Sequence, residues 1–133
     1  MSLDNVTPHH GSVSEYQASG VPYVSSSHAL VDTAVAQFNF PFVTRHLTVF
    51  NSGTAAVRVG FTTNGVNAAE TSNYLILAGD GSTPRLEIKC VSLFVRKDEG
   101  TAENVVSVVA GITNIPDTHF FTMTGSNGIT GIG

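Results

Sequence analysis

Apolar and polar side chains alternate in short segments along most of the chain. In the third of these segments, Leu47 and Val49 alternate with His46, Thr48 and Phe50. Alternation with a period of two is typical of a β-strand that buries one face. The pattern predicts eight strands, at 21–27, 34–40, 43–50, 55–62, 73–78, 85–90, 91–97 and 104–112. Helix signals are nearly absent, so the sequence predicts an all-β, single-domain antiparallel β-sandwich.

Short runs of Gly, Asn, Asp and Ser separate several of these strands. The runs are NSG at 51–53, NG at 64–65, GDGS at 79–82 and KDEG at 97–100. Their residues tolerate a positive φ angle or close a turn through the side chain. We therefore predict hairpin turns at these four places.

The sixth and seventh predicted strands join without a turn in the run RLEIKCVSLFVRK at 85–97. Leu86, Ile88 and Cys90 share one phase of the alternation, and the inward set changes phase between Cys90 and Leu93. A β-bulge or a bend from one sheet onto a second sheet produces such a change.

Both ends of the chain lack this alternation. Residues 1–20 are polar and broken by Pro8, Gly11 and Gly20, which predicts an extended N-terminal arm. After the domain at 21–116, the tail at 117–133 has an aromatic part that we expect to pack and a Gly-rich end that we expect to reach a neighbour or fray.

The composition narrows the possible partners. The chain has 133 residues and a mass of 13.9 kDa, of which 12% are charged and 41% hydrophobic, so most of its surface must be uncharged. Such a surface suits a protein whose faces are covered by neighbours. A net charge of -4 argues against a nucleic-acid partner. No apolar run approaches the ~18 residues of a membrane span, and no signal peptide is evident, so we expect a soluble, unprocessed chain.

The sequence gives only weak signals for catalytic or metal-binding residues. Arg58 lies on the polar phase of its strand, so we expect it to project outward or to pair with a cross-strand acid such as Glu87. The adjacent His9 and His10 have no third ligand at suitable spacing, and Cys90 has no partner for a disulfide or a zinc site. The sequence therefore predicts no catalytic residue, no cofactor and no metal.

The order of segments FNSGTAAVRVGFTTNGV, NYLILAGDGS, RLEIKCVSLFVR and VVSVVAGITNIP resembles small structural proteins of virus particles. It is most similar to minor capsid proteins of large DNA viruses, and less so to tailed-phage head proteins, over about residues 43–116. The resemblance implies a jelly roll of eight strands in two four-stranded sheets. It also implies a role in the virion as a pentameric vertex cap (penton) or as cement between capsomers. Jelly-roll and immunoglobulin-like connectivity both remain open, because strand number and alternation are common to the two.

Two functional hypotheses follow. In the first, a non-enzymatic virion protein buries its lateral faces against copies of itself, with a pentamer favoured, or against the major capsid protein. The candidate interface residues are Phe120, Phe121, Met123, Tyr16 and Tyr23. In the alternative, the chain is a carbohydrate-binding or receptor-binding module that takes a glycan. The absence of Trp and the presence of only three Tyr weaken this alternative, because sugar rings stack on such side chains.

Overall fold

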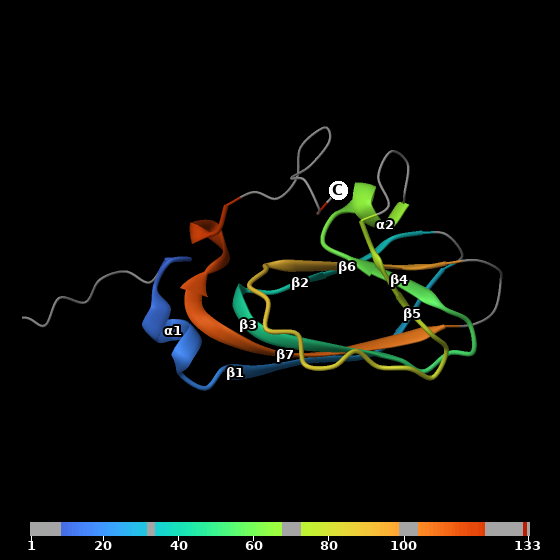
Figure 1. Ribbon diagram of the computed structural model, residues 1–133, viewed down its shortest axis with the longest axis horizontal. Helices are drawn as coiled ribbons and strands as arrows, with labels where there is room; N and C mark the ends of the chain where they lie inside the picture. Colours follow the sequence, from blue (N-terminus) through green and yellow to red (C-terminus); the bar gives the residue numbers. More distant parts are fainter. Residues whose placement is uncertain (1–8, 32–33, 68–72, 99–103, 122–131, 133) are drawn as a thin grey trace, which may run out of the picture.

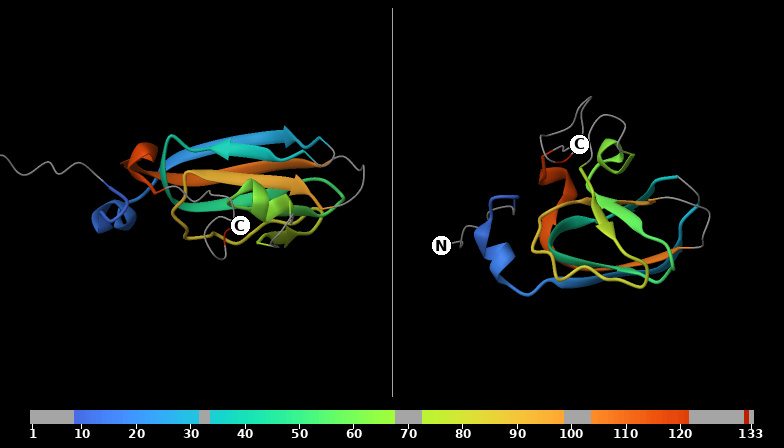
Figure 2. Two further views of the ribbon diagram at one scale, coloured as in Figure 1. Left: turned by 90° about the horizontal axis from the view of Figure 1, so that it is seen from above. Right: turned by 45° about the vertical axis from the view of Figure 1, so that its right-hand side comes forward.

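The computed structural model describes residues 9–31, 34–67, 73–98, 104–121 and 132. Seven strands occur in these residues: β1 (Val21–Ala29), β2 (Ala36–Asn39), β3 (Phe42–Asn51), β4 (Val57–Gly60), β5 (Leu75–Leu77), β6 (Ser92–Lys97) and β7 (Val105–Pro116). Three short helices accompany them: α1 (Val13–Gln17), α2 (Thr63–Asn67) and the 3-10 helix η1 (Asp117–His119). The strands form two sheets packed face to face, which confirms the all-β sandwich (Figures 1 and 2).

Strands that are distant in the sequence pair within each sheet. The three-stranded sheet has the order β1-β7-β3 and the four-stranded sheet the order β2-β6-β4-β5, and every pair is antiparallel. The first strand therefore pairs with the last, for example at Val24↔Val109. The second strand pairs with the sixth, for example at Phe38↔Leu93.

The predicted strand at 85–90 is wrong as a regular strand. The 82–90 segment runs beside β3 but forms only the isolated bridges Leu47↔Leu86 and Phe50↔Ser82. Threonine hydroxyls replace ladder bonds here, because Thr44 Oγ1 accepts from the Cys90 amide at 2.9 Å and donates to the Ile88 carbonyl at 2.7 Å. The segment thus borders the three-stranded sheet through side chains as well as through its backbone.

Of the two expected causes of the phase change in 85–97, a bulge or a bend onto a second sheet, the structure shows the bend. The Cys90 carbonyl accepts a hydrogen bond from the Thr44 amide of β3 at 3.0 Å. The next carbonyl, that of Val91, accepts at 2.9 Å from the amide of Phe40, which follows β2 in the other sheet. The chain therefore crosses from one sheet to the other at these two residues, which explains the change of phase in the sequence.

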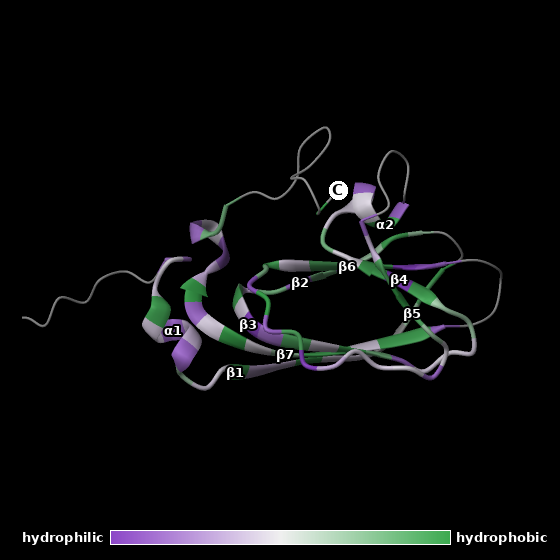
Figure 3. Ribbon diagram, in the orientation of Figure 1, coloured by the Kyte–Doolittle hydropathy of each residue, from purple (hydrophilic) through white to green (hydrophobic). Residues whose placement is uncertain are grey.

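The core lies between the two sheets. Figure 3 shows hydrophobic and hydrophilic residues alternating along the strands. Burying a Val, Leu or Phe side chain stabilises the fold by about 1.5–3 kcal/mol relative to exposure. The largest fully buried apolar side chains are Phe40, Leu47, Leu93, Ile115, Val43, Val49, Val57, Val66, Val95, Val106 and Val108.

The N-terminal arm is not extended throughout, because Val13–Gln17 is helical. The Glu15 carboxylate accepts a hydrogen bond at 3.2 Å from the Asn114 amide of β7. A Cβ atom on Gly20 would lie 2.7 Å from the Gly111 Cα, so only glycine allows the chain to enter β1 so close to β7. Residues 9–20 therefore fold onto the same end of the sandwich as η1 (Figure 1).

The predicted hairpin turn at 64–65 is also wrong, because both residues belong to α2. Thr62 Oγ1 accepts a hydrogen bond from the Gly65 amide at 3.0 Å, which satisfies a donor in the first turn of the helix. The connection from β4 to β5 is therefore a longer excursion that carries a helix.

Candidate functional site

Two of the predicted interface residues belong to an aromatic cluster formed by His10, Phe120 and Phe121. The rings of Phe120 and Phe121 stack with centroids 4.4 Å apart. The His10 ring meets both edge-on, at 6.3 Å and 5.8 Å. Phe121 is 49% exposed, so the cluster joins the N-terminal arm to the C-terminal tail and still presents an aromatic surface to solvent.

The other predicted interface residues differ in their placement. Tyr16 donates to the His10 carbonyl at 2.8 Å and lies under the Lys89 ammonium, 4.7 Å from the ring centroid. Burial raises the pKa of the Tyr16 hydroxyl. Tyr23 packs edge-on against Phe40 at 4.9 Å and adjoins the core, where it is partly buried. Met123 lies outside the described residues.

Arg58 does not project freely outward, and its partner is not Glu87. Its Nε donates to Asp98 Oδ1 at 2.8 Å and its Nη1 to the Val66 carbonyl at 3.0 Å. The guanidinium also lies over the Tyr74 ring, 4.6 Å from the centroid. With its side chain only 15% exposed, Arg58 is a structural residue.

Arg58 belongs to the outer face of the four-stranded sheet, which we call the covered face and define by Arg58, Gly60, Phe94 and Arg96. Arg96 lies opposite Arg58 and donates to Asn67 Oδ1 at 3.1 Å. Both arginines thus reach the C-terminal end of α2. Figure 1 shows α2 lying over this side of the sandwich.

Two further contacts hold α2 in place. Val66 is fully buried, and a Cβ atom on Gly60 would lie 2.7 Å from its Cγ1, so glycine lets the helix sit directly on β4. Thr62 Oγ1 donates to the carbonyl of Ile132 at 2.9 Å. The end of the chain therefore returns to its own domain at Ile132.

The outer face of the three-stranded sheet is different, and we call it the open face, defined by Pro22, Val24, Thr48, Phe50 and Val109. Val24, Val109 and Thr48 are direct cross-strand neighbours. Val24 is 64% exposed, Phe50 39% and Val109 37%. None of the five side chains is charged. The sequence offered one signal for this exposed face, namely Phe50, an aromatic residue on the outward phase of a strand.

His46 lies beside the open face and keeps it uncharged near pH 7. Burial, followed by the charges of Arg85 and Arg45, lowers the pKa of His46 below its ordinary value. The ring covers Gly111 on β7, where a Cβ atom would lie 2.5 Å from its Nε2. The neutral imidazole therefore acts as part of the sheet surface.

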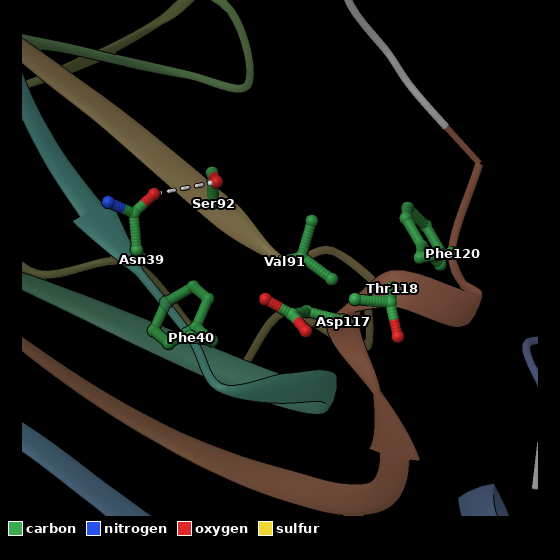
Figure 4. Close-up of a pocket in the computed structure, with 7 residues that line it drawn as sticks. All are labelled: Asn39, Phe40, Val91, Ser92, Asp117, Thr118 and Phe120. Carbon is green, nitrogen blue, oxygen red and sulfur yellow. Dashed lines mark hydrogen bonds between the residues drawn. The ribbon is translucent and has the colours of Figure 1, made fainter.

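A hollow at this end of the sandwich has a volume of about 450 Å³ (Figure 4). It lies between the ends of β2 and β6 and the 3-10 helix η1. Its lining residues are Asn39, Phe40, Val91, Ser92, Asp117, Thr118 and Phe120. Phe120 thus belongs both to the aromatic cluster and to a wall of the hollow.

Within the described residues, the one cysteine and the potential metal ligands are placed as follows. Cys90 is buried, and burial raises the pKa of its thiol to about 11, so it lacks the thiolate character of a nucleophile. Across the described part of the chain, no three His, Cys, Asp or Glu side chains gather as they would around a metal ion. None of the described helices has the length and apolar character needed to cross a membrane.

No family model, curated protein or solved structure matches this chain. The fold itself defines the class of protein, which is an all-β sandwich of two antiparallel sheets.

Proposed function

We propose that the chain is a non-enzymatic structural protein of a virus particle, a jelly-roll penton or minor capsid protein that assembles through its lateral faces. The observation that carries the proposal is the nesting of its strand pairs. β1 pairs with β7, β2 with β6 and β4 with β5, while the 82–90 segment bridges to β3. A jelly roll is one long antiparallel hairpin of eight strands wound into two sheets, which requires this nesting. The 82–90 segment takes the place of the sixth strand.

The same pairing favours a jelly roll over an immunoglobulin-like sandwich. Immunoglobulin connectivity places the first, second, fourth and fifth strands in one sheet. Here the first strand shares its sheet with the third and the last, and the second, fourth and fifth lie in the other sheet. The alternative left open by the sequence is therefore the weaker one.

The open face supports assembly with further copies. Its exposed apolar side chains span all three strands of the sheet, and contiguous apolar patches on a soluble domain mark interaction sites. Each copy has a net charge of -4, so an uncharged face is where two copies approach with least repulsion. β1 is in addition an edge strand of nine residues without Lys, Arg, Asp or Glu. Edges of this kind are open to pairing with another chain.

Light scattering after size exclusion tests the proposal. A pentamer has a mass of about 69.5 kDa, five times the 13.9 kDa of one chain. That mass is the expected result for a penton. A monomer that binds assembled capsids is the expected result for a cement protein. A monomer that binds no capsid would contradict both roles.

A further inference from the structure

Asp117 presents its carboxylate to the hollow of Figure 4. The stick view shows this carboxylate between Phe40 and Val91, directed into the space that the hollow occupies. The Asp117 backbone is anchored, because its amide donates to the Pro41 carbonyl and its own carbonyl accepts from Phe120. Within the described residues, the structure gives its carboxylate oxygens no hydrogen bond or ion pair.

The other polar groups around the hollow are acceptors or face elsewhere. Ser92 Oγ donates its proton to Asn39 Oδ1 at 3.0 Å, which leaves lone pairs on the hydroxyl oxygen. Asn39 Oδ1 also accepts from Gln37 Nε2 at 2.7 Å, and Figure 4 shows the Asn39 amide nitrogen turned away from Asp117. The Thr118 hydroxyl is likewise directed away, with its methyl group nearer Asp117.

This arrangement selects a class of ligand. An anion is repelled by the carboxylate, and a sugar hydroxyl needs donors as well as acceptors from its site. A guanidinium or ammonium group carries only donors, and its aliphatic stem packs on apolar walls such as Val91 and Phe120. A volume of about 450 Å³ is ample for one such side chain.

The chain itself supplies a candidate for this ligand. Of its six basic residues, four donate hydrogen bonds and one is buried: Arg58 to Asp98, Arg85 to Glu87, Lys89 to His10, Arg96 to Asn67, and Lys97 at 4% exposure. Arg45 is the remaining one, and the described residues provide it with no hydrogen bond or ion pair. It lines a second hollow of about 220 Å³ with Tyr16, Glu87 and Lys89.

The two hollows are lined by different residues. Arg45 is part of β3 in the three-stranded sheet, whereas Asn39 and Ser92 place the Asp117 hollow at the end of the four-stranded sheet. A contact between Asp117 of one copy and Arg45 of the next can repeat around a closed ring, or it can occur twice across a two-fold axis.

We propose that the Asp117 hollow binds the Arg45 guanidinium of a second copy of this chain. The inference rests on the proposed function for the existence of the assembly, and adds to it the pair of residues that joins neighbouring copies. An Arg suits the site because its planar fork presents two donors to one carboxylate.

A charge exchange tests the pair. We expect D117R and R45D each to weaken self-association at least about tenfold, and the double exchange D117R/R45D to restore it. D117N is the neutral version, and D80N is its control, because Asp80 is an exposed turn residue far along the sequence and Asn tolerates its positive φ of 55. Assembly of D117N at the same concentrations as the unmodified protein overturns the inference, as does a folded double variant that stays dissociated.

A titration tests the hollow separately from assembly. L-Argininamide is added to ¹⁵N-labelled protein, and shifts are expected at the amides of Val91, Ser92 and Thr118, with loss in D117N and retention in D80N. Absence of shifts in the unmodified protein overturns the cation site even if a pentamer forms. If the unmodified protein stays monomeric at every concentration, the chain does not assemble with itself. That result overturns the penton form of the proposed function, and it also overturns Arg45 of a second copy as the ligand. In that case, shifts that are lost in D117N would still support binding of a cation in the hollow, but not binding of Arg45 from a second copy.

Discussion

The two outer faces of the sandwich arise from the same alternation of residues and end in opposite states. The covered face of the four-stranded sheet lies under α2, with Val66 fully buried against it. The open face of the three-stranded sheet leaves Val24 64% exposed. The positions of the polar phase are therefore not equivalent, because the chain buries one set itself and leaves the other exposed.

The charges are distributed in the same unequal way. Arg58 and Arg96 lie side by side on the covered face, where Arg58 donates to Asp98 and to the Val66 carbonyl, and Arg96 donates to the Asn67 carbonyl. The open face carries no charged side chain. The covered face tolerates charge because the partners of its arginines are fixed in place. Under the function that we propose, the open face would dock a second copy more easily because it is uncharged.

The largest effect on stability is expected where the covered face is closed. V66A removes a fully buried side chain and leaves a cavity between α2 and β4, so it should lower the free energy of unfolding by about 2.5 kcal/mol. V24A, the same change on the open face, should cost less than about 0.5 kcal/mol. Urea unfolding of the dispersed protein measures both. Equal losses would show that the two faces are not different in burial.

A somewhat smaller loss is expected from the arginine network. R58M removes the partner of Asp98 and the donor to Val66, and should cost about 2 kcal/mol after allowance for the 28% exposure of Asp98. R85M is the matched control, because the Arg85–Glu87 pair is 60% and 63% exposed. Its loss should be under about 0.5 kcal/mol. The comparison fails if R85M destabilises the protein as much as R58M does.

A substitution on the open face should change self-association of the protein and hardly change the free energy of unfolding. V109K places a charge in the centre of the face and should change the free energy of unfolding by less than about 0.5 kcal/mol, because Val109 is already 37% exposed. The mass in solution should nevertheless fall toward that of one chain, because an ammonium group must be desolvated at the contact. Light scattering at matched concentrations measures it. An unchanged pentamer for V109K would exclude this face from the contact.

The smallest effect is a pH dependence from His46. Its pKa is lowered in the folded chain, so below the unfolded value of about 6.5 the unfolded chain takes up the proton first. Stability is therefore retained above that pH and declines as the pH falls through and below it. Urea midpoints from pH 8 to pH 5 should show a steeper decline for the unmodified protein than for H46Q. Parallel curves would show that His46 contributes nothing.

The alternation of the sequence predicted the sandwich because one-sided burial is a local property of each strand. Leu47 and Val49 are fully buried, as their phase requires. The bend at Cys90 was also legible, because a change of sheet reverses which phase faces inward. The loss of regular pairing at 85–90 was not, because it depends on the Thr44 hydroxyl of a distant strand.

The candidate site was less predictable because it depends on which strands become neighbours. Asp98 reaches Arg58 only because β4 lies beside β6, whereas Glu87 belongs to a segment that borders the other sheet. Tyr23 is a predicted interface residue, and its packing on Phe40 depends on which strands become neighbours. The sequence pattern did not single out Asp117 as a site residue, because an acid after a proline is typical of a solvated turn.

The nesting of the strand pairs determines the order in which the pairs can form while the chain is being synthesised. β1 is synthesised before every other strand, yet its partner β7 ends only at Pro116. Until the ribosome has released nearly the whole domain, β1 has no template, and the pair that closes earliest is β4 with β5. Pairings of such long sequence separation form slowly, which leaves apolar strands without partners during synthesis. We therefore expect the domain to be completed from its middle outward, and to depend on chaperones most when its first strand is waiting for its last.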